Sequence, residues 1–128
     1  MVKLIAAAAR AVLLALSMCV AAGAAVQAGG ADVVDVKVTR SADSFSFDVT
    51  VRHADTGWQH YANKWEVVGP DGKVLGTRVL YHPHVDEQPF TRSLSGVRIP
   101  AAVKTVTVRA YDSKHGAGGK EMTVDVPQ

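Results

Sequence analysis

The stretch FSFDVTVRH, from Phe45 to His53, is the part of the sequence that decides the fold class. Large apolar residues alternate with polar ones over its whole length. Successive side chains of a β-strand point to opposite faces of a sheet, so this pattern predicts a strand with one face buried and the other in solvent. His53 continues the apolar phase, and we therefore expect its ring to point toward the mouth of the core.

The same period-two alternation recurs in six further segments, and no segment after residue 28 has helical spacing over three turns. We predict an all-β fold: an immunoglobulin-like β-sandwich of about seven antiparallel strands, with Trp65 as its core tryptophan. In the fourth strand, Leu75, Val79 and Tyr81 share one phase. The expected strands cover residues 34–39, 45–52, 61–67, 73–82, 90–99, 106–110 and 122–126, and GAGG at 116–119 is expected to be a loop.

Residues 1–28 have the features of a secretory signal peptide, with a basic start, an apolar run and small residues at the end. We predict cleavage after Ala28, with Ala24 as the second choice, and a single domain over residues 29–128. The sequence LSMC, ending at Cys19, leaves lipid attachment open as an alternative. The expected location is periplasmic or secreted, without stable insertion in a membrane after cleavage.

The charge balance of the remaining chain excludes some partners. The full chain has 14 basic and 12 acidic residues, and Lys3 and Arg10 lie in the predicted leader, so residues 29–128 are formally neutral apart from five histidines. Nucleic-acid binding needs a clustered basic footprint and is not expected. With Cys19 in the leader, the predicted domain has no disulfide, no thiolate ligand and no cysteine nucleophile.

All five histidines are expected at one end of the domain. If consecutive strands are antiparallel, the connections at 54–59, 83–88 and 113–119 share one end, and those at 41–44, 69–72 and 100–104 share the other. The histidines flank or lie in the first set of connections: His53, His60, His82, His84 and His115.

Imidazole is a common ligand for zinc and copper, and three or four converging ligands make a site. We predict metal binding at this end by His53, His60, His82 and His115, with His84 or Asp86 as substitutes. Without cysteine, and with Met122 as the one methionine after residue 28, the donor set favours copper(II) or zinc over copper(I). Asp55, Glu87 and Asp112 are nearby carboxylates, usable as ligands or as acceptors that orient an imidazole.

A different class of function stays open beside metal binding. Trp58, Tyr61 and Asp86 are candidate partner contacts in the same loops, which fits a metal-free interaction module that docks on an envelope protein. Loop histidines also stiffen turns without binding anything. No nucleophile turn of the G-x-S-x-G kind is present, and we expect that the protein is not an enzyme and needs no cofactor other than the metal.

Two longer runs carry a resemblance: GWQHYANKWEVVGPDGKVLGTRVLYHPHVDEQPF at 57–90 and VTVRAYDSKHG at 106–116. The chain resembles small secreted proteins of Gram-negative bacteria that have an immunoglobulin-like β-sandwich and no settled function. The resemblance implies a periplasmic address and one compact domain, and it carries no catalytic residues.

Overall fold

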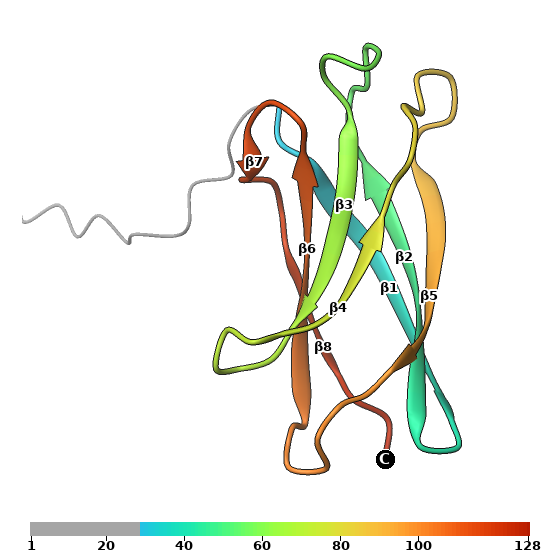
Figure 1. Cartoon of the computed structure of the whole chain (residues 1–128), viewed down its shortest axis with the longest axis vertical. Coiled ribbons are helices and arrows are strands. Elements are labelled where there is room, and N and C mark those ends of the chain that lie inside the picture. Colours follow the sequence, from blue (N-terminus) through green and yellow to red (C-terminus); the bar gives the residue numbers. More distant parts are fainter. Residues whose placement is uncertain (1–28) are drawn as a thin grey trace, which may run out of the picture.

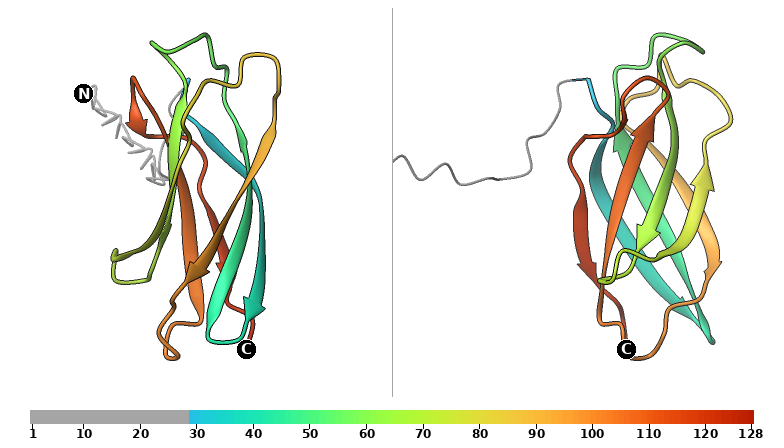
Figure 2. Two further views of the ribbon diagram at one scale, coloured as in Figure 1. Left: turned by 45° about the vertical axis from the view of Figure 1, so that its right-hand side comes forward. Right: turned by 60° about the vertical axis from the view of Figure 1, so that its left-hand side comes forward.

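Two antiparallel sheets form a β-sandwich in the computed structural model, which describes residues 29–128. The predicted leader, with Cys19, lies outside the described residues. One sheet has the order β1-β2-β5, and the other has the order β4-β3-β6-β7, with β8 also paired to β6. Figures 1 and 2 show the two layers facing one another. The predicted all-β, antiparallel sandwich is confirmed. The strands are β1 (Asp32–Ser41), β2 (Ser44–Arg52), β3 (Ala62–Val68), β4 (Val74–Val79), β5 (Phe90–Val97), β6 (Thr105–Asp112), β7 (Gly116–Ala117) and β8 (Met122–Asp125).

Alternating burial along the strands builds the core. In β2 the side chains of Phe45, Phe47, Val49 and Val51 are all buried, as their phase predicts. The largest fully buried side chains are Trp65, Phe47 and Phe90, contributed by strands of both sheets. Burying each such aromatic ring contributes roughly 1.5–3 kcal/mol, so these rings hold the two layers together.

Two details of the predicted strands are wrong. Part of the GAGG segment pairs with β6 as the two-residue strand β7, with Tyr111 opposite Ala117. The fourth strand ends at Val79, and beyond it Leu80 is buried while Tyr81 is 75% exposed, so the expected inward phase of Val79 and Tyr81 is inverted. A register irregularity in the β3–β4 pairing, between Val67 and Val68, accompanies this change of phase.

The loops after β2, β4 and β6 lie at the same end of the sandwich, at the top of Figure 1. This arrangement confirms the shared end that antiparallel strand order predicts. The opposite end carries the β1–β2 hairpin and the β5–β6 connection. Within residues 29–128, no helix is long and apolar enough to cross a membrane.

Candidate metal centre

The first ring of the site extends the buried face of β2 past the end of the strand. His53 follows Arg52 in the apolar phase and is almost fully buried, and Asp55 continues the same phase and is buried too. The Nδ1–H of His53 donates to Asp55 Oδ1, which also accepts the amide of Ala62 at 3.0 Å. A carboxylate that accepts from Nδ1–H fixes the tautomer, so the lone pair of the ring is on Nε2.

Nε2 of His53 faces two oxygen atoms. It lies 3.0 Å from the carbonyl oxygen of Gly29 and 3.2 Å from Asp112 Oδ2. A neutral imidazole has one N–H, and Asp55 already accepts it, so the lone pair on Nε2 would face two further acceptors. A metal ion between these atoms would remove this unfavourable contact.

Asp112 is the centre of the cluster. It extends the buried phase of Val106, Val108 and Ala110 at the end of β6, as His53 does for β2. Its Oδ2 lies 3.2 Å from His53 Nε2, 3.5 Å from His60 Nε2 and 2.9 Å from His115 Nδ1. Three ring nitrogens from different segments therefore converge on one fully buried carboxylate oxygen.

The turn after β6 holds this carboxylate in place. Asp112 Oδ1 accepts the backbone N–H of Lys114 at 2.8 Å and the backbone N–H of His115. Burial by itself raises the pKa of Asp112, but the hydrogen bonds from the backbone and ring of His115, and then from the Lys114 amide, outweigh it and lower the pKa to about 2. Asp112 is thus an anion at any physiological pH.

His60 completes the group from the β2–β3 loop. An antiparallel bridge with Gly57 fixes its backbone, and Thr56 donates to its carbonyl at 3.0 Å. Its ring meets His53 edge to face at 4.7 Å and His115 at 5.0 Å between centroids. Within residues 29–128 its buried Nε2 has no hydrogen-bond partner. A buried nitrogen without a partner, 3.5 Å from a carboxylate oxygen, is available as a metal ligand.

Two of the three spacings between these atoms suit ligands of one metal ion. One ligand atom each from His53, His60 and Asp112 lie within 4.8 Å of one another. Ligands about 2.0–2.2 Å from an ion at tetrahedral angles lie about 3.4 Å apart, close to the two nitrogen–oxygen distances of 3.2 and 3.5 Å. Two imidazoles and one carboxylate form a recurrent three-ligand set that leaves coordination positions open. His115 lies outside this mutual group and contacts it through Asp112.

The other two histidines form a separate pair, 4.6 Å apart between ring centroids. His82 is exposed, whereas His84 is buried, stacks on Phe90 at 3.9 Å and receives a hydrogen bond from Arg92. Burial first, and then the charges of Arg92 and His82, lower the pKa of His84. The predicted single cluster of five histidines therefore divides in two, because the β4–β5 loop turns its imidazoles toward Arg92. Among the ligand groups of residues 29–128, neither His82 nor His84 belongs to one of three converging residues.

Asp55 links the two clusters, since its Oδ1 holds His53 while its Oδ2 accepts the backbone N–H of His84 at 2.7 Å. Asp55 and Asp112 were expected as nearby carboxylates, usable as ligands or as acceptors that orient an imidazole, and not as leading metal ligands. Their signal is present in the sequence, because both continue the buried period-two phase of a strand and both are therefore inward-facing carboxylates. Asp86, a predicted substitute ligand, is exposed.

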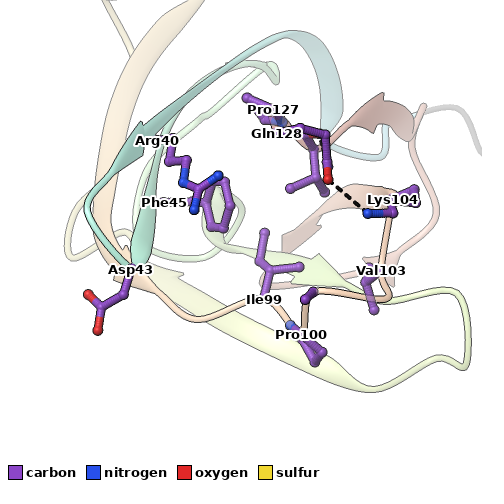
Figure 3. Close-up of a pocket in the computed structure, with 11 residues that line it drawn as sticks. Arg40, Asp43, Phe45, Ile99, Pro100, Val103, Lys104, Pro127 and Gln128 are labelled. Carbon is purple, nitrogen blue, oxygen red and sulfur yellow. Dashed lines mark hydrogen bonds between the residues drawn. The ribbon is translucent and has the colours of Figure 1, made fainter.

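The candidate partner contacts lie in the same loops. Trp58 is 67% exposed and meets Tyr61 edge to face at 5.6 Å between centroids. At the opposite end of the sandwich a hollow of about 310 Å³ lies between the β1–β2 hairpin, the β5–β6 connection and the last residues. Figure 3 shows it, with Lys104 donating to Gln128. No histidine lines it.

Comparison with known proteins gives a relative in sequence. A protein of the archaeon Halomicrobium mukohataei, named "Putative lipoprotein", is 41% identical over 96 residues, which are 74% of this chain and 47% of the relative. The chain thus spans about half the length of the curated relative it matches. This relative gives no support to the predicted Gram-negative bacterial origin. No protein-family model matches the chain.

Solved structures with a similar fold are more distant. A hypothetical protein of Pyrococcus horikoshii is 15% identical with a TM-score of 0.53, over 80% of this chain and 94% of that one. A superoxide reductase in its oxidized state is 15% identical with a TM-score of 0.50, over 79% of this chain and 92% of that one. The two likenesses concern the fold.

The prediction that the protein is not an enzyme is therefore wrong. It depended on the missing nucleophile turn, which bears on hydrolases alone. A sandwich similar to this one forms a superoxide reductase, which is an enzyme, so the fold does not exclude catalysis.

Proposed function

We propose that this protein binds a divalent transition-metal ion through His53 Nε2, His60 Nε2 and Asp112 Oδ2. The observation that carries the proposal is the convergence of ring nitrogens on Asp112 Oδ2, with the buried Nε2 of His60 left without a partner. His115 is proposed to orient the carboxylate of Asp112, since its ring and its amide both bond to it.

The donor set supports copper(II) or zinc as the ion. Imidazole with carboxylate suits both, and residues 29–128 contain no cysteine for a softer ion. Two histidines and one carboxylate with open positions also suit iron(II), which the binding experiment therefore includes. The side chains of His60 and His115 are 21% and 26% exposed, so solvent reaches this side of the site. A bound ion would supply Lewis-acid or redox chemistry to a small molecule arriving there.

The proposed location is the cell envelope or the extracellular space. It is supported by the leader-like sequence of residues 1–28 and by the lipoprotein name of the relative. Cleavage after Ala28 leaves a single domain of residues 29–128, and lipid attachment at Cys19 is the alternative. The intact mass of the chain recovered after export distinguishes the two, because only the lipidated form retains Cys19 and carries the mass of the acyl chains.

Calorimetric titration of the purified protein with zinc, copper(II) and, under anaerobic conditions, iron(II) tests metal binding. We expect one ion per chain in the wild type and loss of that binding in His60→Ala. The matched control is His82→Ala, which removes an exposed imidazole at the same end and should bind as the wild type does. His115→Ala should weaken affinity about 10–100-fold, as removal of an orienting group does. Equal uptake by the wild type and His60→Ala would refute the proposed site.

A second candidate function uses the same loops without a metal. Trp58, Tyr81 and Val85 are 67%, 75% and 52% exposed, and exposed aromatic residues are enriched in protein interfaces. An interaction module would dock an envelope protein through these side chains. Trp58→Ala would then abolish co-purification of that protein from an envelope extract, whereas His60→Ala would not.

A further inference from the structure

A second polar site lies at the histidine end, where the edge strands β4 and β5 of the two sheets approach one another. Arg78 of β4 reaches across and donates from Nε to the carbonyl of Ser93 in β5 at 2.9 Å. The hollow between them measures about 160 Å³, several times the ~30 Å³ that one water molecule takes up in the liquid. Its lining residues are Arg78, Leu80, Tyr81, His82, His84 and Arg92.

His84 presents an unused hydrogen-bond donor in this lining. Its Nε2 accepts from Arg92 Nη2 at 2.9 Å, so the proton of the neutral ring is on Nδ1. The residue is 5% exposed, and within residues 29–128 its Nδ1 has no hydrogen-bond partner. Leaving a buried donor unpaired costs about 1–3 kcal/mol.

The charges around the hollow are positive. Two guanidinium groups and two imidazoles line it, and no acidic side chain does. Arg78 bonds to the carbonyl groups of Ser93 and Val79 and to no carboxylate of the described residues. Arg92 has one acidic neighbour, Glu87 at 3.5 Å, whose side chain is 60% exposed and which therefore attracts it weakly. Both guanidinium charges are available to a ligand.

We propose that this hollow binds a small oxyanion, such as phosphate, sulfate or the carboxylate of a small acid. Guanidinium groups bind planar and tetrahedral oxyanions through paired N–H donors, and two of them face this hollow from opposite sheets. The site uses none of the proposed metal ligands and does not depend on the metal.

An NMR titration of the full protein with sodium phosphate tests this site, with sodium acetate as the carboxylate arm and sodium chloride at equal ionic strength as the control. We expect saturable shifts of the amide signals of residues 80–82, 84 and 92 with at least one oxyanion and not with chloride. Arg78→Gln should weaken this binding at least tenfold. Arg98→Gln is the matched control, since it removes an exposed arginine paired with Asp43 in the β1–β2 hairpin.

The proposal would be overturned if the shifts do not saturate or if chloride reproduces them. It would also be overturned if Arg98→Gln weakens oxyanion binding as much as Arg78→Gln does. If Arg78→Gln loses the native spectrum, His82→Asn replaces it, because His82 is exposed and its change leaves the core untouched. His82→Asn should weaken oxyanion binding several-fold, and unchanged binding in that variant would also count against the site. The relative affinities for phosphate and acetate separate a tetrahedral ligand from a carboxylate.

Discussion

The strand pattern places the side chain of Asp112 in the interior, but it does not show that this carboxylate is the centre of the cluster. Its inward direction follows from the alternation of Val106, Val108 and Ala110, so its burial could be predicted. Its role could not be predicted in the same way, because the neighbours that define it come from the β2–β3 loop and the turn after β6. Loop conformation depends on individual backbone hydrogen bonds, which leave no periodic signal in a sequence.

The lowered pKa of Asp112 makes metal-free stability depend on pH. A carboxyl group with a pKa of about 2 in the folded protein, against 3.8 ordinarily, stabilises the fold fully above pH 4. That contribution disappears as the pH falls from about 4 to about 2, and it amounts to roughly 2 kcal/mol at 1.36 kcal/mol per pKa unit. In denaturant unfolding with a chelator present, the unfolding free energy of the wild type should therefore fall more steeply with decreasing pH over this range than that of Asp112→Asn. Identical slopes for the two proteins would contradict it.

The strands were predictable wherever one face is buried and the other is wet. β2 and β6 have this pattern and fall within a residue or two of their expected bounds. β4 was placed less well, because Gly76 and Arg78 interrupt its apolar face and the alternation then gives Tyr81 the wrong direction. β7 is only two residues long, too short for any period to be seen.

The segment between β7 and β8 ties the second sheet to β1. Lys120 accepts the amide of Val33 at 2.8 Å and donates its own amide to Asp32 at 2.7 Å. A Cβ atom at Gly119 would lie 1.9 Å from the carbonyl oxygen of Ala31, so no side chain fits there without moving backbone. The close approach also brings Gly29 beside the ring of His115, at the edge of the metal centre.

Gly119→Ala should therefore destabilise the protein by about 1–3 kcal/mol or more, the usual cost of forcing atoms into a packed site. The midpoint of thermal unfolding measures the loss, at roughly 4–8 °C per kcal/mol for a domain of this size. Lys120→Ala is the matched control, because its side chain is exposed and its backbone bonds are unchanged. A midpoint for Gly119→Ala equal to that of Lys120→Ala would contradict the prediction, because the backbone would then accommodate the added methyl group without loss of stability.

At the scale of the whole molecule, the antiparallel topology gathers the histidines at one end, and the two clusters arise because the loops there turn apart. The strand order alone was enough to predict the shared end. The division of the histidines into two clusters depends on side-chain contacts that the strand order does not give. Arg92 donates to His84 at the β4–β5 edge, and the carboxylate of Asp112 contacts the rings of His53, His60 and His115. The proposed metal ligands belong to both sheets, since His53 follows β2 and Asp112 ends β6.

An ion bound to His53 and Asp112 would join the two layers of the sandwich, so metal binding should stabilise the whole fold. An ion present at 100 times its dissociation constant adds about 2.7 kcal/mol to the unfolding free energy, provided that the unfolded chain does not bind it. For a domain of this size, the thermal midpoint should then rise by roughly 10 °C or more. Calorimetric scans with the tightest-binding ion, and again after a chelator is added, measure the rise and its reversal. Asp112→Ala removes the ligand from the second sheet and should show no such rise. A rise in Asp112→Ala equal to that of the wild type would show that the ion binds elsewhere. It would then not join the two sheets through His53 and Asp112.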